Sequence, residues 1–336
     1  MRRTRGSSGM AGVRVGRARL LVIGLGVAVA IGLVAWAGAD AIGEAVLRAG
    51  WILPGLVALH ALQLVLSALA WREASGGGGP GPAIWALIRW IREAVNSMLP
   101  VAQMGGLVVG VRLLGHRGVA AATGSAGTTL DTIVEALAQF LFTLLGLATL
   151  AAVTGDAWWL RWLGAMLLLM GLAVAALLLA ERGGGVAFGR RFLVRLGASF
   201  PALPLAALRR LSGELRRLRT DQGALWRAGL LHLLAWLLGV AETWAALAAI
   251  GWPVGLPAAL VIESLGTAAR SAGFAVPGAL GVQEGALVLV GGLLGVPAEP
   301  AVALSVIKRA RELVVGLSGL LAWQWAEGRR LVRRMP

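Results

Sequence analysis

Several charged side chains lie inside stretches that are otherwise apolar enough to cross a lipid bilayer. A charge at the bilayer centre costs ~2.5–3.5 kcal/mol on the insertion scale, so these residues should face one another or a water-filled cavity. Together they could hold a polar headgroup or couple ions, or they could be buried salt bridges that only fix helix packing. They are Asp131, Glu135, Glu263, Arg270, Glu284, Lys308, Arg309 and Glu312.

The spacing of these residues predicts that they share a few helix faces. Asp131 and Glu135 are four positions apart, and Arg309 and Glu312 are three positions apart. Side chains at such spacings lie on one side of a helix. A third group falls within residues 263–270. The three groups predict a polar interior shared by several helices.

Other kinds of chemistry find little support. The chain has no cysteine, which excludes thiol catalysis, disulfides and cysteine metal sites. Its three histidines, His60, His116 and His232, lack the spacing of metal ligands. We therefore expect no metal, no cofactor and no enzymatic activity. The net charge is +15, but the positive residues cluster between apolar runs, which is typical of cytoplasmic loops and not of nucleic-acid binding.

The composition of the chain predicts that membrane-spanning helices position these residues. The chain is 58% hydrophobic and only 14% charged, against about 25% charged residues in soluble domains. These values predict an all-α polytopic membrane protein. A spanning helix needs ~17–25 apolar residues, and we expect the first one to remain uncleaved. The six predicted spans are 20–38, 51–71, a span within 122–153, 158–180, 226–250 and 301–325.

Two further apolar regions, 84–111 and 257–296, contain residues that break helices. Proline and glycine are poor material for a helix interior. Non-helical backbone at membrane depth is tolerated where protein buries it or where it lines a cavity. The predicted breaks are Pro100, Gly105, Gly106, Pro277, Gly278 and Gly281, and the polar residues expected at the two tips are Asn96, Gln103, Gln283 and Glu284.

Arginine placement predicts the topology, because cytoplasmic loops are enriched in positive charge. Arg72, Arg89 and Arg92 lie on the near side of the first broken region, and Arg112 and Arg117 lie just beyond it, so both its flanks are expected on the cytoplasmic side. The two flanks of each broken region then lie on the same side of the membrane. Each region must therefore be a hairpin that starts and ends on one face. The predicted divisions are a cytoplasmic N-terminus (1–19), a first membrane half (20–153), a second half (154–325) with a basic cytoplasmic insert (181–227), and a cytoplasmic tail (326–336).

The insert contains the sequence LPLAALRRLSGELRRLR, in which leucines recur every three or four residues with arginines between them. This pattern is typical of a basic amphipathic helix that lies on an anionic leaflet. An ordinary positive cytoplasmic loop would explain the same arginines. Both alternatives stay open, with anionic lipid as the expected partner in the first.

An internal repeat relates the two membrane halves. A shift of 177 residues places Pro100 on Pro277 and Glu135 on Glu312. The same shift places Asp131 on Lys308, which reverses the charge. An odd number of crossings in each half makes this an inverted-topology repeat, the plan of many transporters. The reversed signs predict that Arg270 pairs with an acid of the first half, Asp131 or Glu135.

Two motifs carry a family resemblance. VPGALGVQEGALVLVGGLLGVP, followed by ALSVIKRARELVVGL, resembles the signature of the lysylphosphatidylglycerol synthase transmembrane family. WIREAVNSMLPVAQMGG and the later TLDTIVEALAQFLFTLLGL resemble the hopanoid-biosynthesis-associated subgroup of that family. One departure is Leu107, where the family pattern leads us to expect an acidic residue.

The resemblance implies a flippase-like protein of the bacterial inner membrane that binds a lipid, such as a hopanoid, and moves it between leaflets. Full synthases of the family carry a soluble aminoacyl-transferase domain after the membrane part. This sequence ends at Pro336 without one, so we expect no synthase activity. Two alternatives stay open: a non-transporting scaffold that holds lipid-synthesis enzymes at the membrane, and an intramembrane lipid transferase.

Overall fold

The computed structural model describes residues 39–99, 105–156, 158–169, 205–273 and 279–334. These residues form helices joined by turns, with no strand among them, so the chain is an all-α polytopic membrane protein. Three described helices are long and apolar enough to cross a membrane: Gly43–Ala74, Ala121–Thr154 and Gln222–Ile250. The predicted span 20–38 lies outside the described residues, and helix Trp158–Leu169 is the described part of the predicted span 158–180.

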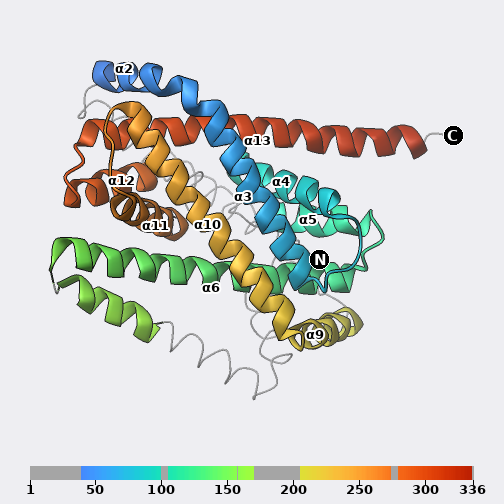
Figure 1. The fold of residues 1–336 in the computed structure, drawn as a ribbon. Helices are drawn as coiled ribbons and strands as arrows, with labels where there is room; N and C mark the ends of the chain where they lie inside the picture. The colour runs from blue at the N-terminus through green and yellow to red at the C-terminus, as the bar shows by residue number, and fades with distance from the viewer. Residues whose placement is uncertain (1–38, 100–104, 157, 170–204, 274–278, 335–336) are drawn as a thin grey trace, which may run out of the picture.

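The helices follow the predicted order of elements (Figure 1). They are α2 (Ala39–Ala49), the 3-10 turn η1 (Gly50–Ile52), α3 (Leu53–Ala74), α4 (Pro82–Met98), α5 (Gly105–Gly115), α6 (Ala121–Thr154), α9 (Leu205–Arg219), α10 (Gln222–Ile250), α11 (Leu256–Ala272), α12 (Val282–Leu293) and α13 (Ala298–Arg334).

The helix boundaries agree with the predicted repeat. α6 begins at Ala121 and α13 at Ala298, which are 177 positions apart. Packing follows the repeat as well: α3 lies along α10, α4 packs on α13, and α11 packs on α6 (Figure 1). Each hairpin therefore rests on a long helix of the other half.

Both predicted hairpins are present as helix pairs, α4 with α5 and α11 with α12. The predicted breaks Pro100, Pro277 and Gly278 and the tip residue Gln103 lie outside the described residues. Next to the first tip, the Gly106 amide donates to Asn96 Oδ1 at 2.9 Å. A Cβ on Gly106 would lie 2.4 Å from the carbonyl oxygen of Arg92, so glycine permits this close turn.

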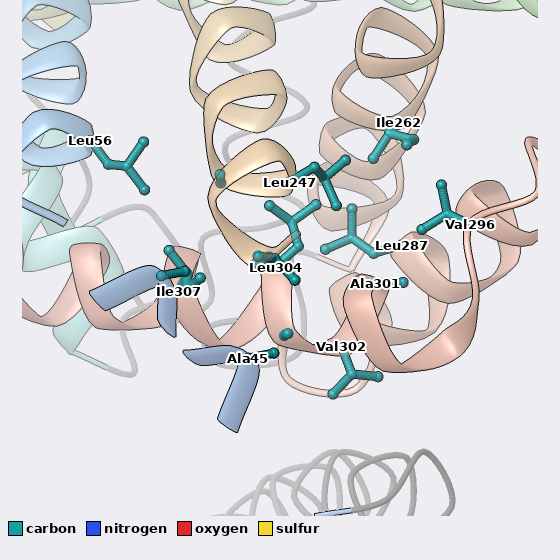
Figure 2. Packing of buried hydrophobic residues seen from close by; sticks show 14 residues of the cluster. Ala45, Leu56, Leu247, Ile262, Leu287, Val296, Ala301, Val302, Leu304 and Ile307 are labelled. Atoms are coloured by element: carbon teal, nitrogen blue, oxygen red, sulfur yellow. The ribbon is translucent and has the colours of Figure 1, made fainter. Parts of the chain in front are cut away.

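A buried apolar cluster holds the second half together. Leu247, Ile262, Leu287 and Leu304 meet between α10, α11, α12 and α13, and Leu56 of α3 joins the same cluster (Figure 2). Lipid tails are as apolar as these side chains, so van der Waals packing between the helices, and not transfer out of water, stabilises the cluster. The first half has its own cluster around the edge-to-face pair Trp71 and Trp85, whose ring centres are 4.9 Å apart. These clusters fix the helices whose polar faces form the site.

Helix α9 is the predicted amphipathic helix of the insert. Its apolar side chains Leu211, Leu215 and Leu218 pack against a cluster that includes residues of α3, α6 and α10. Arg209 and Arg216 are exposed on its other side. The apolar face is therefore covered by the protein itself, and the exposed basic face is the part that remains for an anionic leaflet.

Single cysteines test the predicted topology of the first hairpin. Ala83→Cys and Ala120→Cys place exposed thiols in the first turn of α4 and after α5. We expect a membrane-impermeant maleimide to label both from the cytoplasmic side, and to label Trp252→Cys, in the loop before α11, only from the opposite side. Labelling of positions 83 and 120 from different sides of the membrane would contradict both the hairpin and the inverted repeat.

Candidate functional site

A polar cavity of about 530 Å³ lies between the two halves. Side chains of α3, α4, α6, α10, α11 and α13 form most of its wall, so both halves contribute to it. Its charged and amide lining residues are Gln63, Arg89, Arg92, Glu93, Asn96, Glu135, Gln139, Glu263, Arg270, Gln283, Lys308, Arg311 and Glu312.

Asp131 is the centre of an ion-pair network in the first half. Its side chain is fully buried, and Oδ2 accepts hydrogen bonds from Arg92 Nη1 at 2.9 Å and from Arg89 Nη1 at 3.3 Å. Its Oδ1 lies 2.9 Å from Nε2 of the buried His232. Arg89 also donates to Glu135 Oε1 at 2.5 Å. Two guanidinium groups of α4 thus neutralise two carboxylates of α6.

Arg89 and Arg92 correct the sequence analysis. We counted them among the cytoplasmic positive charges, but each is only 5% exposed and lies inside the protein. Burial of a charge is tolerated when it is paired and hydrogen-bonded, and Asp131 supplies that partner. The spacing of residues 89, 92, 93 and 96 already places them on one helix face. That spacing was the signal that we missed.

The second half has a matching network with the signs arranged differently. Lys308 Nζ on α13 donates to Glu263 Oε2 on α11 at 2.5 Å, and Thr243 of α10 donates to the same oxygen. Arg311 Nη1 lies 2.5 Å from both carboxylate oxygens of Glu242. In the first half the hairpin helix α4 supplies the bases and α6 the acids. In the second half both helices carry both signs, since Glu263 of α11 pairs with Lys308 of α13 and Arg270 of α11 pairs with Glu312 of α13.

The predicted pairing of opposite charges between halves is wrong. Arg270 pairs with Glu312 of its own half, and Lys308 pairs with Glu263 and not with Asp131. The reason is local, because each network joins a hairpin helix to the long helix that follows it in the same half. The ion pairs that do join the halves involve other residues. Arg227 of α10 pairs with Glu73 of α3 and Arg112 of α5 pairs with Glu327 of α13, and the buried His232 contacts Asp131.

The tip residues of the second hairpin are held by hydrogen bonds. Gln283 Oε1 accepts from Arg270 Nη1 at 3.0 Å. Glu284 accepts from the Gly281 amide at 2.7 Å and from Arg309 Nε at 3.1 Å, and so ties the start of α12 to α13. Gly281 has a φ of +79°, a conformation that favours glycine. Gln283 lines the cavity, whereas Glu284 and Arg309 do not.

Glu93 is the exception among the charged residues of the cavity. It lines the wall and is partly buried, yet within the described residues its carboxylate makes no hydrogen bond or ion pair. The buried indole nitrogen of Trp236, also in the wall, has no partner among them either. Mutual pairing therefore explains most of the buried charges, but it does not explain the cavity or these two groups.

A metal site was the obvious alternative for one cluster. Asp131, Glu135 and His232 could each offer a ligand atom, and these atoms lie within 4.8 Å of one another. However, Arg89 and Arg92 donate to or face both carboxylates. A cation there would have to displace or approach two guanidinium groups, which Coulomb repulsion opposes. The donor set fits an ion-pair network better than a metal centre.

Comparison with known proteins supports the family resemblance seen in the sequence. Residues 23–319 match the family described as the lysylphosphatidylglycerol synthase TM region. No curated protein and no solved structure shows a significant match to this chain. The matched segment contains both hairpins, both ion-pair networks and the cavity. The chain therefore belongs to the lysylphosphatidylglycerol synthase transmembrane-region family, which makes it a membrane protein concerned with lipid handling.

Proposed function

We propose that this protein binds a lipid and moves it between the leaflets of the bacterial inner membrane. The observation that carries the proposal is the polar cavity of about 530 Å³ between two repeated halves. A lipid headgroup crosses hydrocarbon slowly because burying polar groups without partners is costly. Polar side chains along the route lower that cost, while the hydrocarbon tails stay in the bilayer. Exchange of conformation between inverted halves would open the cavity to either face.

The same proposal extends to the lipid that is carried, the orientation of the protein in the membrane and its partner proteins. The resemblance of the sequence to the hopanoid-associated subgroup favours a hopanoid or its precursor as cargo. Both termini lie in the cytoplasm, and the basic face of α9 meets anionic lipid there. The protein binds and moves its lipid without a catalytic step, and lipid-synthesis enzymes are the partners that would supply it.

A second candidate function is a scaffold for lipid-synthesis enzymes that transports nothing. The extent of charge pairing favours it, since Asp131, Glu263 and Glu312 each have a cationic partner inside the protein. Glu93 interacts with Arg89 and Arg270 only at longer range, and it makes no hydrogen bond or ion pair within the described residues. A purely structural interior would have no need of such a carboxylate, which is why we place transport first.

Reconstitution separates the two functions. Purified protein in vesicles is expected to accelerate transbilayer movement of a hopanoid or phospholipid probe above the rate in protein-free vesicles. Glu93→Gln is isosteric and breaks no ion pair, so it should slow transport without unfolding the protein. The matched control is Glu299→Gln at the exposed start of α13, which should transport normally. Folded protein that accelerates no probe would favour the scaffold.

A further inference from the structure

Under the shift of 177 residues, an ion pair beside the second hairpin has no charged counterpart beside the first. In the second half, the third residue of α12 is Glu284 and the twelfth residue of α13 is Arg309. In the first half, the third residue of α5 is Leu107 and the twelfth residue of α6 is Thr132. An ion pair in one half is thus replaced in the other by an apolar and a neutral side chain.

This substitution coincides with the edge of the cavity. Glu284 is buried, is bound to Arg309, and lies outside the cavity lining. Leu107 and Thr132 both line the cavity, and Thr132 is exposed. Ala136, one turn further along α6, also lines the cavity and is exposed. The cavity therefore reaches the protein surface along α6 beside α5, where the first half lacks the ion pair. Ser271 of α11, which is hydrogen-bonded to Gln139 of α6, also lines the cavity and is exposed, so the opening extends toward α11.

We infer that this opening, bordered by Leu107, Thr132 and Ala136, is the portal through which a lipid headgroup enters the cavity from the bilayer. The inference rests on the proposed function and names the place where the lipid binds first.

The chemistry of the opening suits a lipid that keeps its tail outside. Leu107 offers an apolar contact to hydrocarbon, and the Thr132 hydroxyl is already bonded to the Thr128 carbonyl at 2.9 Å, so it presents no free polar group. Charged groups lie just behind the opening, including Glu135 on α6 and Glu93 on α4. A headgroup that passes the apolar border reaches polar partners at once, while its tail remains in lipid.

The equivalent place in the second half is closed by Glu284 and Arg309 in this conformation. Opening the second side requires this ion pair to separate, so the pair acts as a latch on the opposite portal.

The test rebuilds the ion pair of the second half at the portal. The reporter is Ser97→Cys, a conservative change in the cavity wall of a cysteine-free chain. The probe is a phospholipid with a maleimide on its headgroup, mixed into vesicles that contain the protein. We expect Leu107→Glu with Thr132→Arg to slow labelling of residue 97 about tenfold, the change that ~1.4 kcal/mol produces. The exchanged pair, Leu107→Arg with Thr132→Glu, should slow it similarly, and either single change should slow it less.

Two controls distinguish a closed portal from a general loss of labelling and from entry through the second half. Val108→Cys is 69% exposed on α5 and should label equally fast with the portal open or closed. Glu284→Leu with Arg309→Thr removes the ion pair on the other side. Unchanged labelling of residue 97 in both rebuilt pairs, in protein that labels normally at residue 108, would overturn the portal. Labelling that depends instead on Glu284 and Arg309 would place entry in the second half and overturn it too.

The labelling needs no transport, so the portal and the proposed function can fail separately. Slower labelling in the rebuilt pairs without any acceleration of lipid movement would leave a lipid-binding portal on a protein that does not transport. Transport that proceeds at the wild-type rate in both rebuilt pairs, with labelling also unchanged, would retain the function and reject the portal.

Discussion

Replacing Asp131 with alanine is expected to destabilise the protein by ~3–5 kcal/mol, the cost of removing one partner from a buried ion pair. Asp131 is fully buried and receives hydrogen bonds from Arg89 and Arg92. Without it, Arg92 keeps a long contact to Glu135 at 3.7 Å and its position over the Trp71 ring, 5.2 Å from the ring centre, and the buried His232 loses its contact with Asp131. Uncompensated guanidinium groups in the interior should therefore dominate the effect.

Thermal unfolding in detergent, followed by tryptophan fluorescence, measures the change. Asp131→Ala should unfold at a much lower temperature than Glu299→Gln, which alters an exposed carboxylate. Adding Arg92→Met should restore part of the loss, because Arg89 keeps its ion pair with Glu135 and Arg92 carries the charge that Asp131 no longer neutralises. Equal unfolding temperatures for Asp131→Ala and Glu299→Gln would show that the network contributes nothing to stability. Strictly additive effects of Asp131→Ala and Arg92→Met would argue against direct coupling.

The architecture was largely predictable because its signals are periodic and local. The breaks around residues 100 and 277 interrupt apolar runs with proline and glycine, and the structure has a helix pair at each place. A shift of 177 residues, found from a few matched prolines and acids, also relates the observed starts of α6 and α13. Hydropathy does not identify α13 as a spanning helix, because the first half of this helix carries several charged side chains.

The partners of the charges were not predictable in the same way. Helical spacing shows which side chains share a face, but it does not show which neighbouring helix that face meets. Arg270 has acids of both halves in the interior, and only the placement of α11 beside its own half brings it to Glu312. His232 gave no signal of its own, since a lone histidine becomes informative only when Asp131 is seen beside it. The cavity itself depends on those pairings.

The second large effect on stability is expected where helices of the two halves pack closely on a glycine. Gly146 of α6 faces Ser264 of α11, and a Cβ on Gly146 would lie 1.8 Å from Ser264 Oγ and 2.8 Å from its Cβ. Gly319 of α13 similarly faces Ala94 of α4, and a Cβ on Gly319 would lie 2.6 Å from the Ala94 Cβ. Both interfaces that join a hairpin to the opposite half therefore depend on a glycine, as in other tightly packed membrane helices.

Gly146→Val is expected to destabilise the protein by about 3 kcal/mol, at the upper end of the cost of overpacking. The added side chain has no room unless α6 moves away from α11, and that movement would also disturb the Gln139–Ser271 hydrogen bond of 2.6 Å between the same helices. Thermal unfolding and elution as a single species on size exclusion measure the effect. Gly292→Val is the matched control, because nothing lies within 4 Å of a Cβ there.

A compensating change decides whether the contact itself is responsible. Ser264→Gly removes the hydroxyl and the Cβ that the new side chain would strike, so Gly146→Ala combined with Ser264→Gly should be more stable than Gly146→Ala alone. The double variant exchanges the small residue between helices and leaves their separation nearly unchanged. If Gly146→Val unfolds at the same temperature as Gly292→Val, the halves do not meet at Gly146, and the cavity walls would have to be placed differently.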